Sequence, residues 1–258
     1  MEADEWQNLA RATDPALIMA DLGMIPDPWQ ERFLRSSSHR ILLLCSRQLG
    51  KSTSTACLAL AEACYRPDSL VLLVSRSERQ STLLFEKVSA FYKTLRPVES
   101  IKELALSIKL ANGSEIVALP GDGDTIRGFS SPRLVILDEA SRIPDDVLAA
   151  VLPMLVTNKG RLVALSTPRG KLGFFYDLWT SNDPMWERVN AKASESPRIS
   201  AAALAEQRTI LGPRLFAAEF DNEFLEEVDQ VFSEDSIDRI FSADDPDASL
   251  SALDLEGV

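Results

Sequence analysis

The sequence predicts an α/β protein with a mostly parallel central sheet and helices on both faces. Short apolar runs typical of fully buried strands recur along the chain, at 40–45, 69–75, 133–140 and 161–168. Helical patterns long enough to be crossovers lie between these runs, at 52–65, 78–95 and 144–156. Strands that alternate with helices in this way pair in parallel, because each helix carries the chain back across the sheet.

An antiparallel hairpin is expected beside the parallel strands. Asn112-Gly113 lies between two alternating runs within 104–120, and this dipeptide favours a tight hairpin turn. A further strand is expected late in the chain, at 185–193. The sheet is therefore predicted to be parallel in its centre and antiparallel at one side.

The predicted domain covers 1–228 and begins with a helical segment at 1–27. Two helical stretches are expected near its end, at 199–211 and 213–227, separated by a Gly-Pro dipeptide. Residues 229–258 are acidic and rich in serine and aspartate, so we expect a short helix and a linker with little core of its own.

Composition indicates an ordinary globular protein of a reducing compartment. The 258 residues are 45% hydrophobic and 26% charged, which allows one large domain with a core. A net charge of −12 argues against DNA binding by bulk electrostatics, so DNA contact would need local basic loops or an assembly.

Three cysteines without a C-x-x-C motif and a single histidine, His39, disfavour a zinc cluster and a disulfide framework. No run approaches membrane-spanning length and no signal pattern opens the chain, which favours the cytosol.

A phosphate-binding loop (P-loop) is predicted at 45–53, CSRQLGKST. Gly50-Lys51-Ser52 follows a buried strand and opens a helix, where free backbone N–H groups and the helix dipole favour anionic phosphates. Lys51 would reach the β- and γ-phosphates of ATP, and Ser52 would bind Mg²⁺. Cys45 stands where the pattern G-x-x-x-x-G-K-[ST] has glycine, which is tolerable if the backbone there need not approach the phosphates closely. The fold class is thus a P-loop NTPase.

Two more strands end in polar pairs that suit the same chemistry. Asp138 and Glu139 follow the run LVIL; Asp138 would hold Mg²⁺, and Glu139 would orient and deprotonate the attacking water. Without the P-loop upstream, a solvated acidic loop would explain this pair. Ser166-Thr167 ends the next strand, and its hydroxyls can bond the γ-phosphate or the attacking water. An ordinary turn before proline explains Ser166-Thr167 equally well.

These motifs, in this order, resemble the ATPase domain of the large terminase subunit of tailed bacteriophages, the motor that packages DNA into proheads. The resemblance covers roughly residues 25–228. It is carried by PWQERFL at 28–34, CSRQLGKST at 45–53, LVSRSERQS at 73–81, TIRGFSSPRLVILDEAS at 125–141, LVALSTPRG at 162–170 and FAAEFDNEFLE at 216–226. It implies an ASCE ATPase fold of the RecA and terminase type.

The resemblance also implies roles for single residues. Gln30 matches the glutamine that recognises adenine, Arg47 the P-loop arginine that senses the γ-phosphate, and Arg127 the arginine that can reach a neighbouring subunit's ATP. Ser166 and Thr167 match the motif that couples hydrolysis to DNA movement. A plain surface position is the alternative for Gln30 and for Arg127. The implied catalytic residues are Glu139, Arg47, Lys51 and Arg127, and the implied contacts of the nucleotide along the loop are Ser46, Arg47, Gln48, Leu49, Gly50, Lys51, Ser52 and Thr53.

The resemblance further implies cofactors, partners and a location. The cofactors are ATP and Mg²⁺. The partners are double-stranded DNA, the portal protein, the small terminase subunit and further copies of the chain in a ring, expected to be a pentamer, while the free chain is a monomer without membrane contact. The location is the host cell cytoplasm. Large terminases continue into an RNase H-like nuclease, which the 30 residues after Val228 cannot accommodate, so we expect no nuclease activity from this chain.

Other classes of protein share part of this pattern. A superfamily-2 helicase-like ATPase has a similar glutamine, P-loop and D-E-A motif, but it needs a second RecA-like domain. A small-molecule kinase needs an arginine-rich lid and gives Glu139 no role. A non-hydrolysing assembly module would bind ATP without turning it over. Loss of phosphate release in Glu139→Gln, with ATP binding retained, separates the motor from the binding module.

Overall fold

The computed structural model describes residues 3–226, and within this range eight strands form one mixed sheet in the order β3-β4-β5-β2-β6-β7-β1-β8. The strands are β1 (Arg40–Cys45), β2 (Leu70–Ser75), β3 (Ser100–Glu103), β4 (Ser107–Leu110), β5 (Glu115–Pro120), β6 (Leu134–Asp138), β7 (Arg161–Ser166) and β8 (Glu187–Ala191). The predicted parallel core is confirmed, because β5, β2, β6, β7, β1 and β8 pair in parallel. The linker predicted at 229–258 lies outside the described residues.

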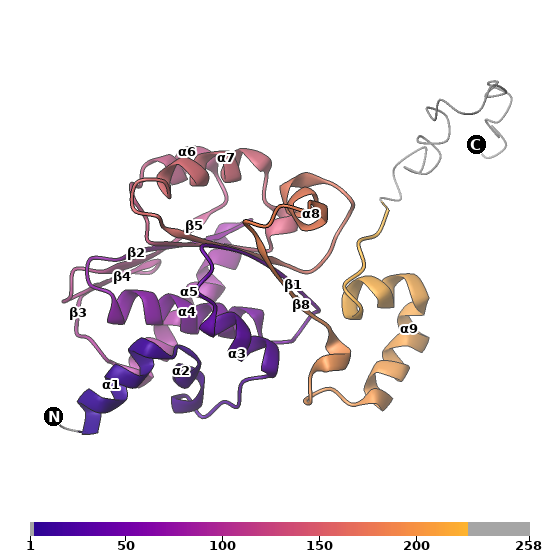
Figure 1. Cartoon of the computed structure of the whole chain (residues 1–258), viewed down its shortest axis with the longest axis horizontal. Helices are drawn as coiled ribbons and strands as arrows, with labels where there is room; N and C mark the ends of the chain where they lie inside the picture. The colour runs from indigo at the N-terminus through magenta and orange to yellow at the C-terminus, as the bar shows by residue number, and fades with distance from the viewer. Residues whose placement is uncertain (1–2, 227–258) are drawn as a thin grey trace, which may run out of the picture. The chain divides into compact units, whose positions relative to one another are not determined.

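Helices cover both faces of the sheet, as the sequence predicts (Figure 1). One face is covered by α3 (Pro28–Arg35), α4 (Lys51–Tyr65) and α5 (Glu78–Leu95), and α1 (Ala3–Thr13) and α2 (Ala16–Asp21) pack against α4. The other face is covered by α6 (Gly123–Arg127), α7 (Asp145–Met154) and α8 (Gly173–Thr180), with the short 3-10 helix η1 (Ala140–Arg142) beside them.

Strand β1 shows why the strand sequences are almost wholly apolar. Ile41 and Leu43 point into the core under α4, while Leu42 and Leu44 point into the core under α7 and α8. All four side chains are at most 1% exposed. A strand buried on both faces has no polar side to alternate with, so its sequence becomes a continuous apolar run.

The order of the strands brings the predicted motifs together. β7 lies between β1 and β6, with Leu44 opposite Ser166 and Asp138 opposite Leu165. Because these strands are parallel, their carboxyl ends meet at one edge of the sheet, where α/β proteins bind ligands. The P-loop, the Asp138-Glu139 pair and the Ser166-Thr167 pair therefore share that edge.

The predicted hairpin is confirmed: β4 and β5 are antiparallel and joined through Asn112-Gly113. Gly113 has φ +85°, and a Cβ there would lie 2.1 Å from a carboxylate oxygen of Asp68, so glycine is required on both counts. The sequence did not predict β3. Its four residues are all exposed, so this edge strand carries no apolar alternation to detect.

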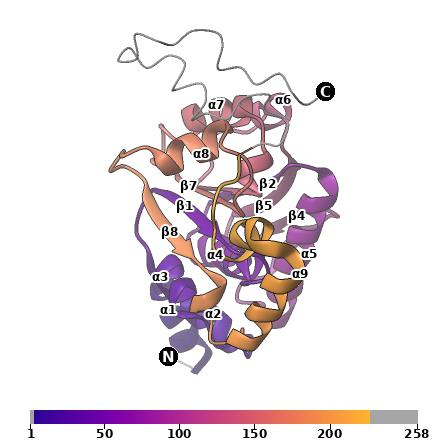
Figure 2. The same ribbon diagram turned by 90° about the vertical axis from the view of Figure 1, so that its right-hand side faces the viewer.

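The carboxyl-terminal helix differs from its prediction. α9 (Ala201–Phe220) contains the expected break at Gly212, which has non-helical φ/ψ, but it ends at Phe220 instead of continuing to 227. The chain turns because Asn222 adopts φ +63° and its buried amide donates to the carbonyl oxygens of Leu44 and Ala191. α9 lies near the ends of β1 and β8 (Figure 1, Figure 2), joined to β8 through η2 (Ala193–Glu195).

The cysteines are core residues of this fold. Cys45, Cys57 and Cys64 are free and buried, and burial raises the pKa of each thiol to about 12. Protonated, buried thiols are poor nucleophiles and poor metal ligands, so we assign them a packing role. Among residues 3–226, no helix is both long and apolar enough to span a membrane.

Candidate nucleotide site

The P-loop connects β1 to α4 by a loop that turns twice through left-handed backbone. Gln48 has φ +60° and Gly50 has φ +89°. At Gly50 a side chain is also excluded by space, since a Cβ would lie 2.9 Å from Nε2 of Gln30. Cys45 still belongs to β1, in extended backbone. This explains why glycine is needed at position 50 and not at position 45.

Lys51 and Ser52 form the first turn of α4, where the backbone N–H groups of a helix have no intrahelical partner and attract anions. Lys51 is 8% exposed, and its Nζ donates to the carbonyl oxygen of Cys45 over 3.3 Å. A single long bond to a neutral acceptor leaves donors of Lys51 for an anion at the helix end.

Asp138 and Glu139 differ sharply in surroundings. Asp138 is 8% exposed, and burial, reinforced by the charge of Glu139, raises its pKa from 3.8 to about 6, although Lys51 opposes the shift. Glu139 is half-buried, and its own N–H donates to Oδ1 of Asp138 over 3.0 Å. Its backbone is left-handed, at φ +55°, an uncommon state that is often found at functional sites.

Ser166 and Thr167 connect the end of β7 to the same acidic pair. The Thr167 hydroxyl donates to Oε2 of Glu139 over 3.5 Å, a long contact. Ser166 is fully buried, and its Oγ lies 2.7 Å from Oγ of Ser141 and accepts the N–H of that residue. Ser141 follows Glu139 by two residues, so the carboxyl end of β7 is bonded both to the Glu139 side chain, through Thr167, and to the turn after Glu139, through Ser166. Sequence patterns did not single out Ser141.

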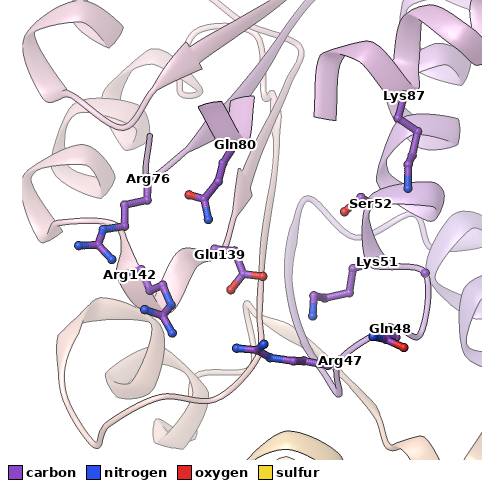
Figure 3. Close-up of a pocket in the computed structure, with 10 residues that line it drawn as sticks. Arg47, Gln48, Lys51, Ser52, Arg76, Gln80, Lys87, Glu139 and Arg142 are labelled. Carbon is purple, nitrogen blue, oxygen red and sulfur yellow. The ribbon is translucent and has the colours of Figure 1, made fainter. Parts of the chain in front are cut away.

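A polar cavity of about 640 Å³ opens beside these groups (Figure 3). Six residues predicted for the site line it: Arg47, Gln48, Gly50, Lys51, Ser52 and Glu139. Four residues that sequence reasoning did not assign also line it: Arg76, Gln80, Lys87 and Arg142. A signal for three of them existed, because Arg76 directly follows a buried strand, Gln80 lies in the first turn of the next helix, and Lys87 lies two helical turns after Gln80.

Other predicted residues lie outside this cavity. Gln30 is 2% exposed, and its amide is occupied: Oε1 accepts the N–H of Asp27, and Nε2 donates to Ser54 Oγ over 2.9 Å. Ser46, Leu49 and Ser166 are buried at 0–1% exposure, and Thr53 accepts from Lys87. Arg127 is the last residue of α6; it is exposed and pairs with Asp124 at 2.7 Å.

An ion pair between buried Asp27 and half-exposed Arg198 supports the P-loop. Asp27, 2% exposed, accepts from Nε and Nη2 of Arg198 at 3.2 and 2.8 Å. Nη2 of Arg198 also donates to the carbonyl oxygen of Leu49 over 2.9 Å, and Gln30 lies close to the same oxygen. We call Asp27, Arg198 and Leu49 the P-loop clamp. It ties the loop to the start of α3 and to the segment that leads into α9.

A second cavity of about 520 Å³ lies between the tip of the P-loop and α9. It shares Arg47 and Gln48 with the first cavity. Its other walls are largely apolar and contain the two polar side chains Gln207 and Glu219. The apolar residues are Ile199, Ala203, Leu204, Leu211, Leu215 and Phe220. The two cavities meet at the P-loop, one polar and one suited to a flat apolar group.

For a metal ion, the site offers oxygen donors of the kind that Mg²⁺ prefers, the Ser52 hydroxyl and the Asp138 carboxylate. No group of three or more histidine, cysteine or acidic side chains placed to hold a metal occurs within residues 3–226. A site with so few protein ligands fits Mg²⁺, which commonly completes its shell with water and phosphate oxygens.

Comparison with known proteins agrees with this geometry. The family model described as "Terminase large subunit, T4likevirus-type, N-terminal" matches residues 42–244. The large terminase subunit of Thermus virus P23-45 is 25% identical over 249 residues, covering 82% of this chain and 51% of the relative. The chain therefore spans about half the length of the curated relatives it matches.

Solved structures show the same fold. The ATPase domain of the large terminase from Thermus phage P74-26 has a TM-score of 0.68 at 24% identity and covers 80% of this chain and 97% of that one. The large terminase of a thermophilic bacteriophage, solved in complex with ADP, has a TM-score of 0.64 at 10% identity, covering 77% of this chain and 54% of that one. The chain belongs to the terminase large subunit family, and its described residues form the fold of that family's ATPase domain.

Proposed function

We propose that this chain hydrolyses ATP as the motor domain of a large terminase and thereby drives double-stranded DNA into a prohead. The observation that carries the proposal is one cavity that brings Lys51 and Ser52, at the start of α4, together with Glu139, which follows β6. A phosphate-binding helix end and a carboxylate that can take a proton are the parts that hydrolysis of a phosphoanhydride needs. Family membership supports the same reaction.

Each residue has a task that its surroundings suit. Lys51 and the amino end of α4 would bind the β- and γ-phosphates, and Glu139 would orient a water toward the γ-phosphorus and accept its proton. Thr167, in contact with Glu139, would hold that carboxylate in place. Ser52 and Asp138 would hold Mg²⁺, which when bound neutralises the charge of the phosphates. The guanidinium of Arg47, at the junction of the two cavities, would reach the γ-phosphate.

The second cavity is our assignment for the adenine base. It adjoins the P-loop and is lined by aliphatic side chains that can contact both faces of a purine, with the Gln207 amide as donor and acceptor. Gln30, whose amide is directed at Asp27 and Ser54, would then contribute through the P-loop instead of touching the base in this conformation.

The partners follow from the family and are part of the proposal. We assign double-stranded DNA, the portal protein and the small terminase subunit as partners, with copies of the chain in a ring, expected to be a pentamer, in the host cell cytoplasm. In such a ring Arg127, exposed at the end of α6, would reach toward a neighbour's ATP. An arginine supplied by a neighbour can raise the rate roughly 10³–10⁵-fold, so the free chain should be a slow ATPase.

The test is phosphate release by the full chain with ATP and Mg²⁺, compared with Lys51→Ala. We expect slow but steady release from the unmodified chain and no release, with lost ATP binding, from the variant. Arg79→Ala is a matched control, because it removes an exposed cation that does not line the cavity. Equal rates in the unmodified chain and Lys51→Ala would overturn the proposal.

A further inference from the structure

The wall of the polar cavity opposite the P-loop is cationic, and its residues take no part in the proposed hydrolysis step. It consists of Arg76, which follows β2, Gln80 in the first turn of α5, and Arg142 at the end of η1. In the view of Figure 3, the Glu139 carboxylate lies between Lys51 on one side and Arg76 and Arg142 on the other. We call Arg76, Gln80 and Arg142 the distal wall.

The two guanidinium groups of the distal wall make no ion pair within residues 3–226, and Glu139 is the one acidic residue that lines their cavity. This is so although the chain carries a net charge of −12. Two cations that face one cavity repel each other, and an anion between them removes that repulsion. Planar guanidinium groups bind phosphate oxygens in pairs, so an oxyanion of phosphorus is the ligand that fits them best.

The geometry of in-line attack indicates which phosphate group would reach the distal wall. In hydrolysis of ATP the water oxygen bonds to the γ-phosphorus while the bond to the β–γ bridging oxygen breaks, and its electron pair stays on ADP. The proton of the water goes to Glu139. Attack and departure are in line, so the phosphoryl group moves away from ADP and toward the attacking water. Since Glu139 holds that water, the released phosphate moves toward the side of the cavity where Arg76 and Arg142 lie.

We propose that Arg76 and Arg142, with Gln80 as an amide donor, form a binding site for the inorganic phosphate released from ATP. This inference rests on the proposed function and adds a product site to it. The P-loop keeps ADP through Lys51 and the end of α4, while the distal wall takes the dianion that leaves. Because α5 and η1 both contribute, phosphate occupancy ties two elements on opposite faces of the sheet to the product state.

The direct test is a calorimetric titration of inorganic phosphate into the full chain, with and without Mg-ADP, at constant ionic strength. We expect saturable phosphate binding by the unmodified chain. The double variant Arg76→Gln with Arg142→Gln should bind phosphate at least about tenfold more weakly than the unmodified chain, because charge-assisted bonds are lost. Its affinity for ADP should stay within about twofold, since the P-loop is intact. Arg79→Gln removes a cation of α5, the helix that carries Gln80, at a position outside the cavity. Its phosphate affinity should equal that of the unmodified chain.

Three results would overturn the proposal. These are an absence of phosphate binding by the unmodified chain, an unchanged phosphate affinity in the double variant, and an equal loss in Arg79→Gln. DNA offers the same phosphate chemistry, so anisotropy of a labelled short duplex forms a separate arm. If the double variant loses duplex binding and keeps phosphate binding, the distal wall serves the DNA backbone and the product site is wrong. Failure of the proposed ATPase shows itself elsewhere, in a Lys51→Ala variant that equals the unmodified chain.

Discussion

Arg47 of the P-loop pairs with Glu219 in the last turn of α9, with Nε 2.5 Å from Oε2. The backbone N–H of Arg47 also donates to the carbonyl oxygen of Glu219 over 3.2 Å. Both side chains are partly exposed, so this ion pair by itself adds little stability. Arg47 also lines the cavity that we assign to the triphosphate, so a γ-phosphate bound there would compete with Glu219 for the guanidinium.

Removing the charge of Glu219 should release Arg47 for ATP. We expect Glu219→Gln to tighten ATP binding roughly two- to fivefold, the range of a lost exposed ion pair, and to leave ADP binding unchanged, because ADP has no γ-phosphate. Equilibrium titrations with both nucleotides measure this. Glu206→Gln, an exposed acid on the same helix, is the control. An equal gain for ADP, or the same gain in the control, would rule out competition at Arg47.

The P-loop clamp should act on nucleotide binding more than on the chemical step. In Asp27→Asn the Arg198 guanidinium keeps its place but loses the carboxylate, so the support of the Leu49 carbonyl weakens. We expect KM for ATP to rise about tenfold while kcat changes less than about threefold, since charge-assisted bonds are lost away from the reacting atoms. Arg198→Lys, which keeps the charge but not the fork, should fall in between.

The matched control for the clamp is Arg208→Gln, which breaks an exposed ion pair between Arg208 and Asp221 elsewhere on α9. It should leave KM unchanged. A fall in kcat of the same size as the rise in KM, in Asp27→Asn, would show that the clamp is needed for the reacting geometry as well as for binding.

Asp138 should destabilise the metal-free protein as pH rises. Its pKa is raised from 3.8 to about 6, so the folded state binds the proton more tightly than the unfolded state does. This favourable contribution is complete below about pH 4 and is lost as pH rises through about 6. Asp138→Asn removes the effect, and its gain in unfolding free energy over the unmodified chain should grow by about 1 kcal/mol between pH 5 and 7.5.

Chemical denaturation of both proteins in EDTA measures that difference. Added Mg²⁺ should reduce the advantage of the variant at pH 7.5, because the ion stabilises the ionised carboxylate of the unmodified chain only. A difference in stability that stays constant from pH 5 to 7.5 would mean that Asp138 titrates normally.

Much of the sheet was predictable because strands that are buried on both faces have almost wholly apolar sequences. β1, β2, β6 and β7 are buried on both faces and read as apolar runs, and Asn112-Gly113 marks the hairpin. The exposed edge strand β3 and the five-residue helix α6 carry no such signal. The early end of α9 depends on Asn222, whose partners Leu44 and Ala191 lie far away in the sequence, so no local pattern could reveal it.

The site divides in the same way. Residues adjacent in sequence to a strand end, such as Lys51 and Glu139, were predictable, because the parallel sheet brings strand ends together. The distal wall and the P-loop clamp were not, since Arg142 and Arg198 acquire their roles only when separate elements meet. The predicted roles of Gln30 and Arg127 stay predictions: the first is buried under the P-loop, and the second is exposed on α6.

The role predicted for Arg127 can be tested by complementation. Arg127→Ala subunits lack the arginine and Lys51→Ala subunits lack the ATP site, so a mixed ring contains interfaces where an intact arginine faces an intact site. We expect the mixture, assembled on portal and DNA, to recover part of the activity that each variant lacks alone. Asp124→Ala, which removes only the exposed partner of Arg127, should retain activity. No recovery in the mixture would place the catalytic arginine within the subunit, at Arg47.

Hydrolysis by Glu139→Gln, measured together with ATP binding, tests the central claim most directly. The glutamine keeps the size of the side chain but cannot accept the proton of the attacking water, so we expect phosphate release to fall on the order of 10²–10⁴-fold. ATP affinity should stay within about twofold of the unmodified chain, because Lys51 and the amino end of α4, which would bind the phosphates, are unchanged. Glu86→Gln, an exposed acid of α5 outside the cavity, should release phosphate at the unmodified rate. A rate in Glu139→Gln within about tenfold of the unmodified chain would contradict the account and require another base.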